Sequence, residues 1–175
     1  AATDGRAFGA TELRVDDGRL DLSDRYGADA VLAPIEVRAV YGLRRSGLRV
    51  DDAVIVAGAS RLEVRGTIEA LDTAELSLLA DLRLQDVTRV WEPPFEGVNE
   101  GRLRLLGNLA IRAGEPVLSG RLSGEEATVA GLPLDRLSTD LQIHSEQVAL
   151  RNLEAELLGG SVTGSVRVDT TVSPG

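Results

Sequence analysis

The sequence predicts an all-β fold, and two observations carry this prediction. Apolar residues alternate with polar ones in long runs, most clearly between residues 101 and 169, where Leu103, Leu105, Leu109 and Ile111 alternate with Arg and Asn. A period of two is typical of a strand with one apolar face and one solvated face. Turn signals separate the runs at short and fairly even intervals, so neighbouring strands are expected to pair as an antiparallel meander.

The composition indicates what kind of apolar surface these strands form. Hydrophobic residues make up 43% of the 175 residues, whereas aromatic residues make up only 3%. A compact β-sandwich normally fills its centre with aromatic as well as aliphatic side chains. The scarcity of aromatics therefore favours a smooth aliphatic wall, with a β-sandwich as the alternative.

The first half of the chain contains five expected β units. A hairpin is predicted over residues 12–15 and 19–23, because Asp16-Asp17-Gly18 between two alternating runs is a strong turn signal. Further strands are expected over residues 35–43, 48–56, 62–68 and 74–84, with the second of these interrupted at Asp51-Asp52.

One short helix is expected where the alternation stops. Asp86 can cap a helical turn over residues 86–91, and Pro93-Pro94 would end it. Trp91, the single tryptophan, is expected to pack against the sheet at this point.

The second half returns to alternation over residues 103–111, 137–143 and 162–168. Turns are expected at residues 113–116, 123–125, 131–133, 144–146 and 159–160. The whole chain then contains roughly a dozen short strands and no long loop.

Several functional classes are disfavoured by composition. A net charge of −9 argues against nucleic acid as a partner, since the phosphate backbone requires a basic surface. The absence of cysteine excludes a disulfide framework and a thiolate metal site. No apolar run reaches the ~18 residues of a membrane-spanning helix.

Catalysis and metal binding have no sequence support either. The pairs Asp16-Asp17, Asp51-Asp52 and Glu125-Glu126 suggest calcium, but adjacent residues in a strand point to opposite faces. His144, the only histidine, is expected to be solvated. Phosphate-binding, nucleophile-elbow and zinc-protease motifs are absent, so the chain is expected to be neither an enzyme nor a cofactor-binding protein.

The glycine-punctuated alternation resembles that of a known superfamily. Residues 116–124 with 129–137, and residues 148–164, are similar to repeats of the AsmA-like bridge-like lipid transport proteins, above all the TamB family of the translocation and assembly module. Residues 13–24 resemble a hairpin of that superfamily, and residues 82–91 its strand leading into a short helix. The resemblance covers about four-fifths of the chain and lies in glycines and alternation, without a polar signature.

The resemblance implies a long, curved antiparallel sheet folded into an open groove, a β-taco, with an aliphatic inner face. In the family such grooves form a periplasmic bridge that carries phospholipid between inner and outer membranes. The implied partners are phospholipid acyl chains, an outer-membrane barrel protein of the assembly-module type and adjacent groove segments of the same chain. The parent protein would be periplasmic and anchored in the inner membrane outside this stretch.

Because the chain contains no Met, we expect it to be a segment excised from a longer protein, with sub-segments of about 10–91 and 98–169. The candidate lipid-binding groove consists of aliphatic residues expected to share one face: Leu62, Val64, Ile68, Leu76, Leu78, Leu82, Leu103, Leu105, Leu109, Ile111, Leu141, Ile143, Leu150, Val162, Val166 and Val168.

Two interpretations of this face stay open. A core covered by a second layer is the structural alternative, although the sequence offers no amphipathic helix to cover it. The functional alternative is an interaction module, in which exposed sheet edges bind outer-membrane protein strands by β-augmentation.

Overall fold

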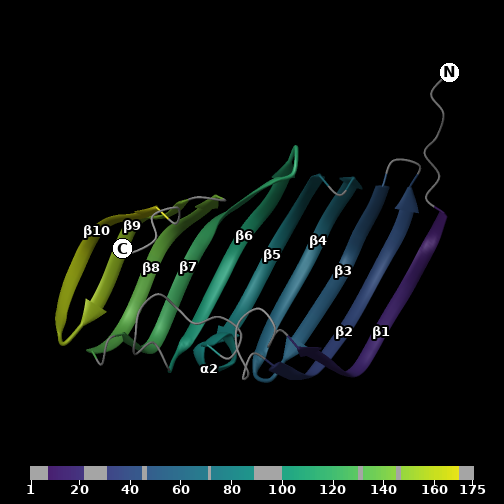
Figure 1. The fold of residues 1–175 in the computed structure, drawn as a ribbon. Helices are drawn as coiled ribbons and strands as arrows, with labels where there is room; N and C mark the ends of the chain where they lie inside the picture. Colours follow the sequence, from purple (N-terminus) through teal and green to yellow (C-terminus); the bar gives the residue numbers. More distant parts are fainter. Residues whose placement is uncertain are drawn as a thin grey trace.

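A computed structural model describes residues 8–21, 31–44, 47–70, 72–88, 100–129, 132–144 and 147–169. All strands in this part of the chain belong to one ten-stranded sheet, in which the spatial order is the sequence order and every neighbouring pair is antiparallel (Figure 1). The strands are β1 Phe8–Asp21, β2 Val31–Arg44, β3 Gly47–Ala57, β4 Ser60–Ala70, β5 Thr73–Arg83, β6 Arg102–Arg112, β7 Glu115–Val129, β8 Leu132–His144, β9 Gln147–Leu157 and β10 Gly160–Asp169.

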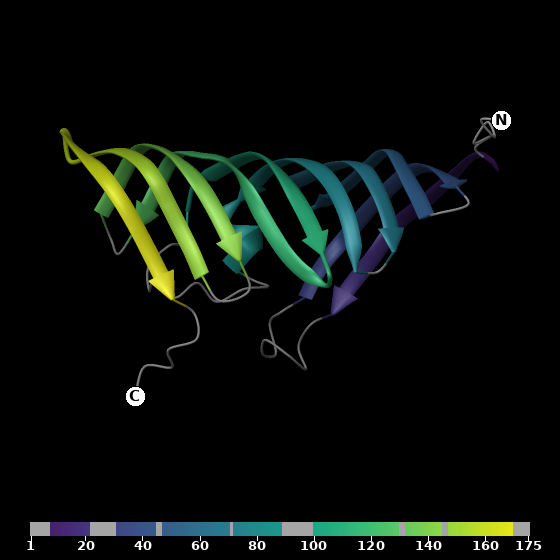
Figure 2. The same cartoon turned by 90° about the horizontal axis from the view of Figure 1, so that it is seen from above.

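This architecture confirms the predicted all-β fold and the antiparallel meander. The sheet is open, with β1 at one edge and β10 at the other. Seen from above, the strands bend into an arch (Figure 2). The described residues form a single layer, so the β-sandwich alternative is wrong for this part of the chain.

The two expected sub-segments form one continuous surface. β5 pairs with β6 from Thr73 opposite Arg112 to Arg83 opposite Arg102 without a register shift. The sheet therefore continues from the first sub-segment into the second.

Two tight turns each place a non-glycine residue and then a glycine at positive φ. Ala113-Gly114 has φ of 51° and 83°, and Leu158-Gly159 has φ of 51° and 73°. Two successive positive φ angles define the hairpin turn whose twist matches that of its strands. Both turns agree with the sequence prediction, whereas the expected turns at 131–133 and 144–146 fall partly outside the described residues.

Two expected turns are wrong. Asp16-Asp17-Gly18 does not reverse the chain: β1 runs through it, with Asp17 at φ 57° and a register shift between Val15 and Gly18. β7 likewise continues through residues 123–125, and Glu126 has φ 54°. In β1 the surplus residue is absorbed as a bulge, because β2 continues on both sides of it. β7 pairs with β8 on both sides of Glu126 without a register shift.

A second bulge explains the expected interruption at Asp51-Asp52. The register shifts there against both β2 and β4, yet β3 stays continuous. Because such bulges merge predicted pieces into longer strands, the described sheet has ten strands instead of about a dozen.

The expected helix is present but begins earlier. Helix α2 covers Leu84–Thr88, and Asp86 lies inside it instead of capping its start. The Asp86 carboxylate accepts hydrogen bonds from the Ala59 backbone N–H at 3.0 Å and from the Ser60 hydroxyl at 2.8 Å. Asp86 thus ties α2 to the turn between β3 and β4. Trp91 lies outside the described residues.

Candidate functional site

The register aligns apolar residues into rows that cross the whole sheet. One row passes from Leu13 in β1 to Val166 in β10, and each residue in it is the direct partner of the next. Its ten members are Leu13, Ala39, Ala53, Val64, Leu78, Gly107, Gly120, Leu141, Leu150 and Val166. Directly paired residues in an antiparallel sheet have side chains on the same face, so this row forms a continuous apolar strip.

All sixteen predicted groove residues lie on the face that contains this row; we call this face the apolar wall. Leu62 and Leu105 belong to a second row, and Leu76, Leu109, Ile143 and Val168 to a third. The outer rows hold Ile68 with Ile111, and Leu82 with Leu103 and Val162.

The prediction missed a comparable number of wall residues. Leu118 and Leu122 in β7, and Ile55 in β3, are direct partners of predicted residues. Others are Leu13, Val15, Ile35, Val37, Tyr41, Leu48, Val50, Leu137 and Val148. The same two-residue alternation marks them.

The apolar wall is the concave face of the arch. Ser60 lies on this face, because it pairs with Ala57 in the row of Ile35. Its hydroxyl donates to Asp86 of α2 and accepts a hydrogen bond from the Arg83 backbone N–H at 2.9 Å. Helix α2 therefore approaches the sheet from the side of the wall, and Figure 2 shows α2 on the concave side.

Exposure along the wall changes from its centre to its edges. In the central strands β5 and β6, Ala74, Ala80 and Leu105 are 3%, 4% and 9% exposed. At the edges Leu13 and Val162 are each 48% exposed. Among the described residues the elements beside the wall are the sheet itself and the five-residue helix α2.

A pair of glycines lies at the middle of the wall. Gly107 and Gly120 are direct partners, flanked in their row by Leu78 and Leu141. A Cβ atom on Gly120 would lie 2.5 Å from the Leu106 carbonyl oxygen and 2.6 Å from the Gly107 Cα. The two backbones approach each other more closely than side chains on this face would permit.

The opposite face is polar and carries ion pairs. Arg side chains meet carboxylates of the same or the adjacent strand: Arg14–Asp16, Arg38–Glu12, Arg49–Asp51, Arg61–Glu63, Arg65–Asp52, Arg102–Asp81, Arg112–Glu75 and Arg136–Glu156. Exposed pairs of this kind stabilise a fold only slightly. They keep charges on the convex side and leave the wall uncharged.

One of these pairs predicts a specific pH dependence. Hydrogen bonding from Arg102 lowers the pKa of Asp81, assisted by the charges of Arg104 and Arg83. A carboxyl whose pKa is lower in the folded protein contributes stability above its unfolded pKa of about 4, and loses it as pH falls through the folded value. Asp81→Asn should therefore unfold at slightly lower urea concentration at pH 7. The difference should disappear near pH 2, and an equal difference at both pH values would contradict this assignment.

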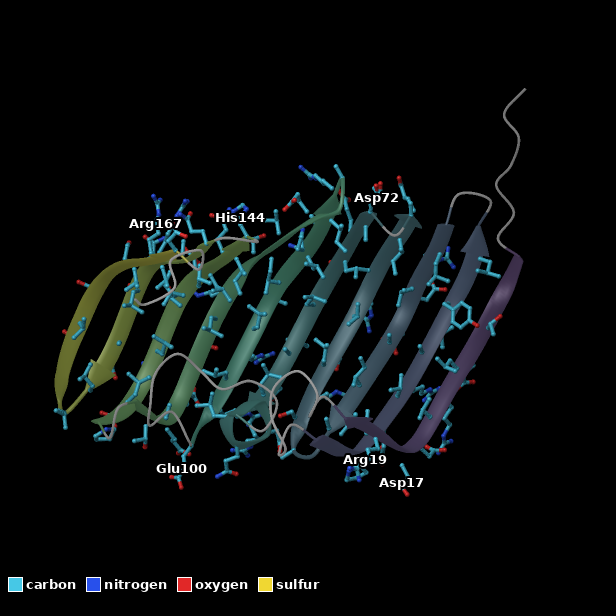
Figure 3. All side chains as sticks on the ribbon, in the orientation of Figure 1. Asp17, Arg19, Asp72, Glu100, His144 and Arg167 are labelled. Carbon is cyan, nitrogen blue, oxygen red and sulfur yellow. The ribbon has the colours of Figure 1, made fainter. Side chains whose placement is uncertain are left out.

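No metal-binding group is found among the described residues. They contain no group of three or more His, Asp or Glu side chains that could hold a metal ion. Asp51 and Asp52 instead pair with Arg49 and Arg65. His144 is exposed at the end of β8, at the opposite end of the strands from Asp17 and Glu100 (Figure 3). No helix in the described ranges is long and apolar enough to cross a membrane.

Fold and site together define a class: an open, single-layer antiparallel sheet with an uncharged aliphatic wall on its concave side. Comparison of the chain with protein-family models, curated proteins and solved structures found no match in any of the three.

Proposed function

We propose that the apolar wall binds the acyl chains of phospholipids and that the chain is a segment of a lipid conduit. The observation that carries the proposal is the continuity of the wall. Two of its rows, those of Leu13 and Thr11, cross all ten strands, and no residue named in the rows is charged. An apolar surface of this extent left uncovered usually marks a binding site.

The dimensions of the wall suit lipid chains. Ten strands give nine spacings of about 4.8 Å each, so the wall extends roughly 43 Å across the strands. The hydrocarbon core of a bilayer, which contains two layers of acyl chains, is about 30 Å thick. Each methylene buried on the wall contributes roughly 0.8 kcal/mol, so a complete acyl chain would be held firmly.

The proposal also covers how a lipid lies on the wall and where in the cell the protein acts. A lipid bound on a concave wall can keep its headgroup in water at the open side while its chains move along the rows. The resemblance to the AsmA-like superfamily supports a periplasmic position between two membranes, in a parent protein anchored in the inner membrane. The proposal assigns no catalytic step to any residue.

Lipid recovery tests this proposal directly. The chain purified from bacterial cells should carry phospholipid, detectable by native mass spectrometry and by lipid extraction. It should also take up a fluorescent fatty acid after delipidation. A folded chain that carries no lipid and takes up no fatty acid would overturn the proposal.

A second candidate function rests on the sheet edges. β1 and β10 have fourteen and ten residues, and each pairs with only one neighbour in the described sheet. An unpaired edge can accept an extended strand through its backbone groups, as in β-augmentation of outer-membrane protein segments. Binding of an isolated barrel-strand peptide by the delipidated chain would support this function, and competition by fatty acid would distinguish the wall from the edges.

A further inference from the structure

We infer that the two edges of the sheet are complementary, so that β10 of one chain pairs with β1 of a second copy and continues the sheet. The partner is thus another copy of this chain, joined head to tail. The pairing does not depend on what the apolar wall binds.

Strand direction is the first requirement, and the sheet satisfies it. Neighbouring strands alternate in direction through ten strands, so β10 runs opposite to β1. A second copy placed beside β10 with the same orientation therefore makes another antiparallel pair. Because the number of strands is even, the alternation of hydrogen-bonded and non-hydrogen-bonded pairs along a row also continues across the junction.

The rows of the wall select one register. The row that begins at Leu13 ends at Val166, and the neighbouring row that contains Val168 begins at Thr11. When Val166 is placed opposite Leu13 of the second copy, each of the two rows continues into the same row of that copy. A shift by one residue would place the apolar side chains of one copy on the polar face of the other.

The edge side chains have apolar area to bury in this junction. Leu13 is 48% exposed and Val166 is 42% exposed, whereas Leu105 in the sheet interior is 9% exposed. Every described residue of β10 is exposed. A second copy would give these edge residues the neighbours that interior strands already have.

Charge on the polar face agrees with the same register. Arg167 lies between Val166 and Val168, and Glu12 lies between Leu13 and Thr11. In the junction Arg167 therefore stands directly opposite Glu12 of the second copy. Opposite charges at paired positions stabilise strand pairing, and like charges there would oppose it.

Disulfide trapping tests the register, because the chain contains no native cysteine. Arg14→Cys and Ser165→Cys place thiols at directly opposite positions of the junction. Paired positions have Cβ atoms about 4.5–5.5 Å apart, which a small movement brings within disulfide range. The two variants, mixed under mild oxidation, should form a crosslinked heterodimer.

The matched control uses Ser161→Cys in place of Ser165→Cys. Both serines are exposed residues of β10 on the polar face, but Ser161 lies four positions away, or about 13 Å along the strand. At least about tenfold less heterodimer is expected with Ser161→Cys, since a thiol four positions out of register cannot reach Arg14→Cys. Circular dichroism should show that all three variants stay folded.

Each other outcome contradicts the inference. Equal yields from both serine positions would mean random collision, and no heterodimer at all would mean that the edges do not pair. Crosslinked homodimers from either variant alone, without the heterodimer, would show that like edges pair symmetrically instead.

Discussion

Replacing Leu141 by Asp is expected to leave the sheet folded while weakening fatty-acid binding at least tenfold. Leu141 lies in the central row between Gly120 and Leu150 and is only half-buried, so a carboxylate there can reach water. In a covered core the same unpaired charge would cost several kcal/mol, a large part of a total stability of about 5–15 kcal/mol. An acyl chain on the wall, however, would contact a charge that it cannot solvate.

Gln142→Asp is the matched control, because Gln142 is the adjacent residue and belongs to the polar face. Binding to this variant should equal that of the unaltered chain. Urea unfolding and uptake of a fluorescent fatty acid, measured on both variants, separate folding from binding. If Leu141→Asp unfolds outright, the face is a covered core; if it folds and binds normally, the wall is not the lipid path. Leu105 is less suitable for this test, since it is 9% exposed and its substitution would disturb folding as well.

The second large effect is expected from Gly120→Val, which should destabilise the sheet by about 3 kcal/mol or more. A Cβ atom at Gly120 would overlap the Leu106 carbonyl oxygen and the Gly107 Cα, at 2.5 and 2.6 Å. Backbone atoms cannot rotate away as a side-chain terminus can, so β6 and β7 would have to separate. Chemical denaturation of the variant measures the loss.

Gly164→Val provides the comparison, because Gly164 is a glycine of the same face and a Cβ atom added to it would meet nothing within 4 Å beyond its chain neighbours. Its backbone φ lies outside the left-handed region, so valine should be tolerated in this edge strand. Comparable losses at both glycines would mean that strand propensity, and not the close approach of β6 and β7, determines the effect.

The apolar wall could be predicted from the sequence because it depends on alternation alone. Once strands pair in order, period two places every second residue between bulges on one face, and all sixteen predicted residues share the wall. The glycine pair at the wall centre could not be predicted in this way. Gly107 and Gly120 become neighbours only through the register of β6 with β7.

The bulges escaped prediction for a related reason. Asp16-Asp17-Gly18 has the composition of a tight turn, and nothing local distinguishes a turn from a bulge. The outcome depends on β2, which pairs with β1 on both sides of the bulge. The hydrogen bonds of Asp86 could not be predicted from the sequence either, because its partners Ala59 and Ser60 lie on another hairpin.

The agreement between sequence order and spatial order has a consequence for how this molecule gains and loses structure. Each strand is hydrogen-bonded only to the strands before and after it. Stability is then close to a sum of nearest-neighbour contributions, as in repeat proteins, and structure can grow hairpin by hairpin. Melting should begin by fraying at β1 and β10. Over evolution, a hairpin inserted or deleted in the middle would change the length of the sheet without rebuilding the rest.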